Sequence, residues 1–192
     1  SELCFCADAH PAAHAPAPSQ ISGSTTLVSD GRLKSTNVSS TLLSALVSDG
    51  TRVYFSEIVD QRYRLAQVLS RGGEPVLIET PFPNTFVQDI SPDKSELLVA
   101  SREVEELEMP LWVMPALGGS PRRLGNVLAH GAAWSPDGRQ IVYANGKSLY
   151  VTGGDGAPSR RLVTLPNRPR RPRWSPDGAR VRMSVYPDRP KL

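Results

Sequence analysis

Four aspartates recur along the chain at a spacing that suggests a shared role, either chemical or structural. They are Asp49, Asp93, Asp137 and Asp177, and the intervals between them are 44, 44 and 40 residues. Recurring carboxylates can bind a metal ion or act as general acids and bases. In a tight turn, however, an aspartate accepts hydrogen bonds from nearby backbone amides. We interpret all four as turn residues, because serine, proline or glycine lies beside each of them.

The N-terminal segment holds the other candidate metal ligands, which are Cys4, Cys6, His10 and His14. Thiolates and imidazoles at short spacings can bind zinc. Proline at position 11 keeps the two histidines from sharing a helical face, and no second cluster of such residues follows. A disulfide between two cysteines separated by one residue would be strained. We therefore predict no metal site and no cofactor.

His130 is the only histidine outside that segment. Hydrolases of the α/β type carry their nucleophile in a G-x-S-x-G motif, and the sequence contains none. We interpret His130 as a loop or packing residue. The sequence thus predicts no catalytic residues and a protein that is not an enzyme.

Charge is unevenly distributed, although the formal net charge is only +3. Residues 43–110 contain 12 acidic and 6 basic residues, whereas residues 159–192 contain 10 basic and 2 acidic ones. A basic stretch can contact nucleic acid or an acidic partner. No aromatic residues alternate with these arginines to stack on bases, so we interpret them as solvated and do not expect nucleic-acid binding. No apolar run approaches the roughly 18 residues of a membrane span.

The elements that position these residues are internal repeats of about 40–45 residues, a length typical of propeller repeats. The stretch AAWSPDG at 132–138 recurs as PRWSPDG at 172–178, and weaker copies lie at 89–94 and 46–50. Within these copies we assign structural turn or packing roles to a set of twelve residues. They are Trp134, Ser135, Pro136, Asp137, Gly138, Trp174, Ser175, Pro176, Asp177, Gly178, Asp93 and Asp49.

A second motif keeps the same spacing. An apolar stretch that begins with leucine is followed by a Gly-Gly or Asp-Gly turn and a proline, at 65–75, 111–121 and 149–158. In the third unit the pattern predicts four short strands: one ending at Trp134, then 141–144, 149–151 and 160–163. A four-stranded antiparallel sheet in each repeat is the blade of a β-propeller.

The predicted fold is therefore all-β: a partial β-propeller of about three and a half four-stranded antiparallel blades. We expect a disordered Ala/Pro-rich tail at 1–20 and a polar linker, or the remnant outer strand of a preceding blade, at 21–41. The incomplete propeller spans 42–192, with repeats at about 42–87, 88–131, 132–171 and 172–192. Because closed propellers have four or more blades, we expect the rest of the propeller to be missing. An unpaired strand near 181–185 and an exposed apolar blade face should result.

The repeats that begin at Trp134 and Trp174 resemble the WD-like repeats of TolB-type propellers. The stretch 111–151 is also similar to the C-terminal propellers of certain bacterial winged-helix regulators. Nothing in residues 1–41 matches a winged helix, so DNA binding does not carry over. TolB-like blades further resemble the propellers that gate prolyl-oligopeptidase-type hydrolases.

Three functions follow from these resemblances. The first is a non-catalytic scaffold or interaction module that binds a protein partner. The second is the sensory or docking propeller of a winged-helix transcriptional regulator. The third is the substrate-gating propeller of a prolyl-oligopeptidase-type serine peptidase. The resemblances imply a bacterial protein and leave its compartment open between cytoplasm and periplasm.

Overall fold

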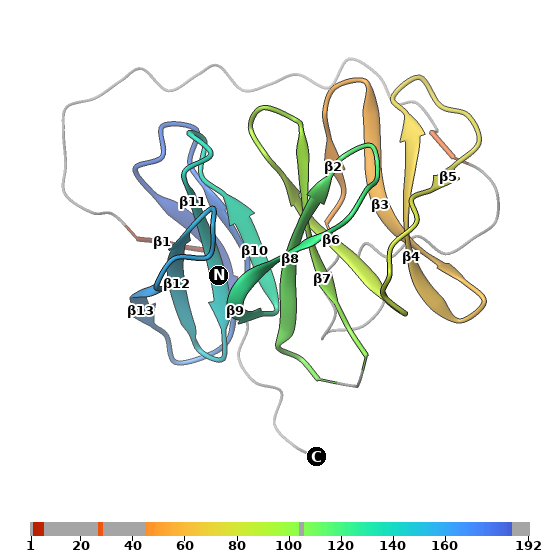
Figure 1. Cartoon of the computed structure of the whole chain (residues 1–192). Coiled ribbons are helices and arrows are strands. Elements are labelled where there is room, and N and C mark those ends of the chain that lie inside the picture. Colours follow the sequence, from red (N-terminus) through yellow and green to blue (C-terminus); the bar gives the residue numbers. More distant parts are fainter. Residues whose placement is uncertain (1, 6–26, 29–44, 104–105, 186–192) are drawn as a thin grey trace.

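The chain folds into strands that form four antiparallel sheets placed side by side. A computed structural model describes residues 2–5, 27–28, 45–103 and 106–185, and these contain strands and no helix. The described part therefore holds no helix that could cross a membrane. Figure 1 shows the first three sheets in sequence order, from orange and yellow through green to blue. The predicted all-β fold of four-stranded antiparallel blades is confirmed.

Three sheets contain four strands each, paired in sequence order. The first consists of β2 (Val47–Ser48), β3 (Arg52–Val59), β4 (Arg62–Leu69) and β5 (Val76–Leu77). The second consists of β6 (Thr85–Ile90), β7 (Glu96–Ser101), β8 (Met109–Pro115) and β9 (Arg122–Ala129). The third consists of β10 (Gly131–Trp134), β11 (Gln140–Asn145), β12 (Ser148–Gly153) and β13 (Arg160–Thr164). The fourth contains β14 (Pro169–Trp174), β15 (Val181–Val185) and β1 (Glu2–Phe5).

The middle strands of the second and third sheets are apolar on both faces, and each of these two sheets is packed between two neighbours. In β7, Leu97 and Val99 pack toward the first sheet, and Leu98 and Ala100 pack toward the third. All four side chains are fully buried. Successive residues of a strand point to opposite faces, so a strand covered on both sides reads as a continuous apolar run.

The tight turns after the first strands of neighbouring sheets lie next to one another. A β-carbon placed on Gly138 would lie 3.6 Å from the ring of Pro92, and one placed on Gly178 would lie 3.8 Å from the ring of Pro136. Both glycines have a φ of 71°, which is the left-handed region that glycine adopts without strain. The three Ser-Pro-Asp turns therefore form one row along one side of the array.

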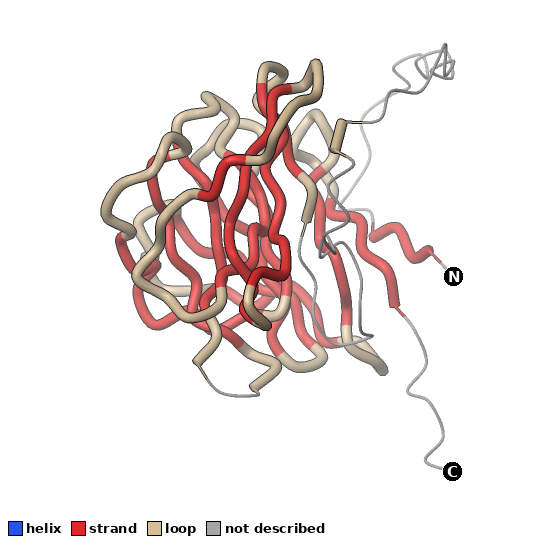
Figure 2. The backbone as a smooth tube through the Cα atoms, turned by 90° about the vertical axis from the view of Figure 1, so that its right-hand side faces the viewer, coloured by secondary structure: helices blue, strands red, loops and turns tan. Residues whose placement is uncertain are grey.

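The N-terminal segment differs from the predicted tail. Glu2–Phe5 form β1, which pairs antiparallel with β15 in the register Glu2 to Ser184 through Phe5 to Val181. Figure 2 shows this strand beside the one that leads to the C-terminal end. The remainder of the expected tail, with Cys6, His10 and His14, lies outside the described residues.

The prediction of an unpaired strand near 181–185 is therefore wrong. β15 pairs with β14 on one side and with β1 on the other. Its apolar residues Val181 and Met183 pack against the third sheet, and Arg182 on the opposite face is exposed. An outer blade face that carries polar residues protects the end of a repeat array. The expected apolar face is thus absent from the described part of β15.

The outer face of the first sheet has a cover of its own. Val53, Phe55, Ala66 and Val68 form a buried cluster there, and Leu27 and Val28 pack against it. The Gly73 amide also donates a hydrogen bond of 3.3 Å to the Leu27 carbonyl. Residues 27–28 thus cover a blade face without forming a strand, and the rest of the predicted linker lies outside the described residues.

The two repeated tryptophans occupy different environments. Trp134 is 7% exposed and belongs to the core between the second and third sheets. Trp174 is only partly buried and packs on the edge of the core of the third sheet. We expected the indole N–H groups to be hydrogen-bonded at the blade edge, but both are buried without an acceptor among the described residues.

Replacing Trp134 with alanine should lower the free energy of unfolding by about 3–5 kcal/mol, since it leaves a large cavity in a packed core. Urea denaturation followed by circular dichroism measures this change. Trp174→Ala should cost less because that side chain is already partly exposed. Trp134→Phe is the matched control: it keeps most of the ring and removes the unpaired N–H, so it should cost less than half as much. Equal effects of the two alanine variants would contradict this assignment.

Candidate functional site

The recurring aspartates lie in turns that share one hydrogen-bond pattern. In the third sheet the Ser135 hydroxyl donates to the Asp137 carboxylate over 2.6 Å and accepts from the Gln140 amide over 2.9 Å. The Asp137 carboxylate also accepts from the Arg139 amide at 3.1 Å. These hydrogen bonds lower the pKa of Asp137, which is fully exposed. Asp93 and Asp177 repeat the arrangement with Ser91 and Ser175.

The turn at Asp49 in the first sheet also uses its aspartate as a hydrogen-bond acceptor, but the residues that donate to it are spaced differently along the chain. The Asp49 carboxylate accepts from the amides of Thr51 and Arg52 at 2.7 and 2.6 Å. Its second oxygen accepts from the Tyr54 hydroxyl at 2.9 Å. Burial and this hydrogen bond raise the pKa of Tyr54 to about 12. Because these carboxylates are engaged with their own turns, we propose that they stabilise the turns and do not bind a ligand. No group of three or more potential metal ligands occurs among the described residues.

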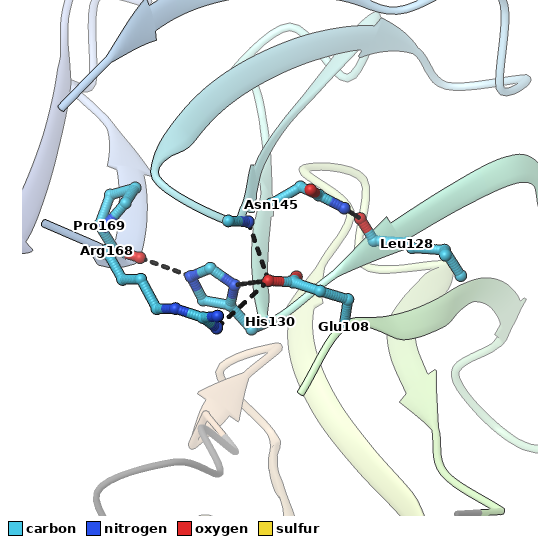
Figure 3. Close-up of polar contacts among 7 residues, drawn as sticks. Glu108, Leu128, His130, Asn145, Arg168 and Pro169 are labelled. Atoms are coloured by element: carbon cyan, nitrogen blue, oxygen red, sulfur yellow. Dashed lines mark hydrogen bonds and ion pairs between the residues drawn. The ribbon is translucent and has the colours of Figure 1, made fainter. Parts of the chain in front are cut away.

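A polar cluster centred on His130 joins three sheets, at the opposite end of the strands from the Ser-Pro-Asp turns. This residue lies between β9 and β10, and its side chain is 3% exposed. Figure 3 shows its ring between the Glu108 carboxylate and the Pro169 carbonyl. The Nδ1 distance to Glu108 is 2.9 Å, and the Nε2 distance to Pro169 is 2.7 Å. Glu108 lies in the loop between β7 and β8 of the second sheet, and Pro169 is the first residue of β14 in the fourth sheet.

Both ring nitrogens of His130 face acceptors. The Pro169 carbonyl can only accept, so Nε2 must carry a proton. Nδ1 lies 2.9 Å from the Glu108 carboxylate and forms a hydrogen bond with it. A ring held in this way has no free nitrogen with which to remove a proton from a nucleophile.

Glu108 gathers further donors around its carboxylate. The Gly146 amide donates to it over 2.8 Å, and an Arg168 guanidinium nitrogen lies 3.5 Å away. Burial acts to raise the pKa of Glu108, but the His130 hydrogen bond and charge, the Gly146 amide and Arg168 outweigh it, so the pKa is lowered. Glu108 is half-buried, whereas Glu103 and Glu106 of the same loop are exposed.

Arg173 forms a second long-range link, which joins the first strands of three sheets (β6, β10 and β14). One Arg173 nitrogen donates to the Ala132 carbonyl over 3.1 Å, and the other donates to the Gln88 carbonyl over 2.9 Å. Arg173 lies in β14, so it connects the fourth sheet with the third and the second. Asp89 lies nearby and accepts from the Trp134 amide at 2.8 Å. Burial raises the pKa of Asp89, although Arg173 and this amide act in the opposite direction.

A groove of about 290 Å³ lies beside the loop that joins β7 and β8. Trp112 forms an aromatic wall, and the Arg123 guanidinium lies 5.9 Å from the centre of its ring. Arg102 and the exposed carboxylates of Glu103 and Glu106 also line the groove. The groove thus offers an aromatic surface with both charge signs at its rim, and these groups fit a polar, extended ligand.

Sequence reasoning located the turns but missed both long-range links. The twelve turn and packing residues are distributed over the four sheets, and the structure does not gather them into one pocket. Glu108 and Arg168 belong to charged stretches that we had interpreted as solvated. No signal in the sequence pairs them with His130, because 22 and 38 residues separate them from it.

Comparison with known proteins identifies the class of fold. No protein-family model matches the chain. The structure is similar to that of a TolB from Agrobacterium tumefaciens, with a TM-score of 0.64 and 23% identity over 72% of this chain and 51% of that one. It is also similar to the tricorn protease, with a TM-score of 0.53 and 16% identity over 77% of this chain and 16% of that one. The fold is that of a TolB-like β-propeller.

One curated relative adds a sequence match. The chain is 28% identical over 92 residues to an uncharacterized peptidase of Bacillus subtilis (strain 168), YuxL. The match covers 44% of this chain and 14% of the peptidase. The chain spans about half of the TolB and a smaller part of the peptidase. The resemblance to winged-helix regulators gains no support from these matches and stays a prediction.

These comparisons overturn the prediction that the protein is not an enzyme. The curated relative is a peptidase, and a propeller of similar fold occurs in a protease. We had excluded catalysis because the sequence has no G-x-S-x-G motif and because we interpreted His130 as a loop or packing residue. That argument concerns this segment alone, and a propeller can serve an enzyme whose reacting groups lie elsewhere.

Replacing Glu108 with glutamine should lower the free energy of unfolding at pH 7 by roughly 1.5–3 kcal/mol, since it removes a charged acceptor from a buried imidazole. The folded pKa of Glu108 lies below the ordinary glutamate value of about 4.5. Its stabilising effect is therefore present above about pH 4.5 and is lost as the pH falls through the folded pKa. The difference between wild type and E108Q should narrow over that range.

Urea denaturation between pH 3 and pH 7 measures this difference. Glu96→Gln is the control, because the Glu96–Arg122 pair is exposed on both sides and should contribute about 0–1 kcal/mol. A constant difference between wild type and E108Q across that pH range would contradict the proposed ion pair.

Replacing Ser135 with alanine tests the turn role of the repeated motif. The Ser135 hydroxyl is buried and serves both Asp137 and the Gln140 amide. Its loss should lower the free energy of unfolding by about 1–3 kcal/mol, measured by urea denaturation. Addition of Ca²⁺ or of a chelator should leave the melting temperature of the wild type unchanged. A melting temperature that rises with Ca²⁺ would instead indicate that the aspartates bind metal.

Proposed function

We propose that this chain is the propeller portion of a serine peptidase and that it binds and admits the peptide substrate. The observation that carries the proposal is the 28% identity to a peptidase over 92 residues. The similarity to the tricorn protease supports it at the level of the fold.

The polar groups of the propeller fit a supporting role in such an enzyme. His130 is the only histidine among the described residues, and both of its nitrogens are engaged by Glu108 and Pro169. Nucleophilic catalysis by serine uses an imidazole with a free nitrogen as the base. The reacting groups would therefore come from residues outside the described part of the protein.

The groove beside Trp112 is the part of the propeller that we assign to substrate contact. Aromatic side chains bind apolar side chains or peptide planes, and Arg123 and Glu106 at the rim can pair with charged ends of a peptide. Arg123 is exposed, so a ligand could reach it without displacing the core. The groove lies where β8 and β9, which carry Trp112 and Arg123, meet the loop that joins β7 and β8. Binding residues are commonly placed in this way, at a loop next to a rigid scaffold.

The test is hydrolysis by the natural full-length gene product. We expect it to cleave short peptide nitroanilides and to be labelled at serine by a fluorophosphonate probe. Arg123→Ala in that protein should raise KM about tenfold with kcat nearly unchanged, the pattern of lost substrate binding.

Arg62→Ala is the matched control, because Arg62 is an exposed arginine at the start of β4 and does not line the groove. It should leave both constants unchanged. If the full-length protein neither hydrolyses peptides nor reacts with the probe, the proposed function is wrong. If hydrolysis occurs but R123A behaves like R62A, only the assignment of the groove fails.

A further inference from the structure

The edge of β15 is occupied by a strand from the other end of the chain. Four consecutive residues of β1 pair with it, from Glu2 opposite Ser184 to Phe5 opposite Val181. The other three sheets are built from strands that follow one another in sequence. The fourth sheet alone takes a strand from a distant segment, and it has three strands where the others have four.

The connection from β1 back to the body of the protein is long. Twenty-one residues, 6–26, separate Phe5 from Leu27, which lies on the outer face of the first sheet. An extended chain of that length can span up to roughly 70 Å. The same length of chain could carry β1 to the β15 edge of another molecule.

The occupied edge has little to hold one particular copy of β1. Pairing of four residues supplies only a few backbone hydrogen bonds, and an open strand edge accepts any extended segment that can pair with it. Residues 2–5 of a second copy have the same sequence and can adopt the same register. The two arrangements therefore make the same strand contacts and differ mainly in the entropy of the connection.

We propose that the edge of β15 is a strand-accepting surface and that Glu2–Phe5 of a second copy can replace the chain's own β1 there. The product is a dimer in which the N-terminal strands are exchanged, a common outcome when an identical element can be shared between protomers. For a strand tethered through a connection of about twenty residues, the effective concentration at its own edge is on the order of 1 mM. Exchange should therefore be rare at micromolar protein and substantial near millimolar. This inference is independent of the peptidase proposal.

Cysteine cross-linking tests the proposal, because Cys4 is directly opposite Arg182 in the register. Opposite residues in antiparallel strands have Cα atoms about 4.5–5.5 Å apart, which a disulfide can bridge. One variant is C6S, which retains Cys4. The other is C4S/C6S/R182C, whose single cysteine lies in β15. When the two variants are mixed, a bond between Cys4 and the introduced cysteine can form only between copies.

After equilibration of an equal mixture at about 0.5 mM total protein, oxidation should link roughly one sixth of the edges that carry the introduced cysteine, because only half of the competing strands from other copies retain Cys4. At about 1 µM the link should be nearly absent. Peptide mass mapping identifies the bond and separates it from dimers formed through Cys4 alone.

The single-chain variant C6S/R182C is the control for the cis arrangement. At about 1 µM it should form the bond within one molecule and remain a monomer. C4S/R182C, which retains only Cys6 in the N-terminal segment, should form it far less. Absence of the bond in C6S/R182C would show that β15 does not hold residues 2–5. An intramolecular bond in that variant with no link between the mixed copies at 0.5 mM would show that the edge is closed in cis only. Either result would overturn the proposal.

Discussion

The structure depends on the packing of sheet against sheet. The middle strands of the inner sheets are apolar on both faces, as the buried run Leu97–Leu98–Val99–Ala100 shows, so these blades bury their side chains only with a neighbour on each side. One buried cluster lies between each pair of consecutive sheets. The first and last sheets have a neighbour on one side only, so their outer faces need another cover or polar residues. Leu27 and Val28 cover the apolar face of the first sheet, while the last sheet presents the charged Arg182 on its outer face.

Polar groups fix how the sheets are placed relative to one another. The Ser-Pro-Asp turns act within each sheet, and their row is continued by contacts between neighbouring turns. Glu108, His130 and Arg168 act between sheets, as does Arg173 across the inner strands. A buried polar group is satisfied in few arrangements, so such links favour one rotation between blades over others. Among the described residues, the indole N–H groups of Trp134 and Trp174 and the Oε1 of Gln67 are buried without a hydrogen-bond partner.

The residues that can contact a ligand gather at one part of the scaffold. The groove is lined by Trp112 of β8, by Arg123 of β9 and by charged residues of the loop that joins β7 and β8. The fold alone does not decide between a binding module and part of an enzyme, because similar propellers occur in TolB and in a protease. The sequence match to a peptidase is the basis of the proposed function, and the engaged nitrogens of His130 fit the supporting role proposed there for the propeller.

Local features of the fold could be predicted from the sequence. The repeat length, the strands on either side of Ser135-Pro136-Asp137-Gly138 and the hydrogen-bonding role of the aspartate follow from interactions within a few residues. Because these interactions join residues that are close together in the sequence, the blade unit was predicted correctly. The part that the serine hydroxyl plays in the turn was seen only in the structure.

Only the tertiary structure decided how the ends are closed and which distant polar groups meet. The sequence did not mark Glu2–Phe5 as a strand. Pairing at a strand edge uses backbone groups that every non-proline residue possesses, so it leaves no signature in the residue types. Glu108 and His130 meet because consecutive sheets bring two loops together, and Arg173 reaches Gln88 because the inner strands converge. Such contacts depend on the angle between sheets, a property of the assembled blades that no single stretch of sequence encodes.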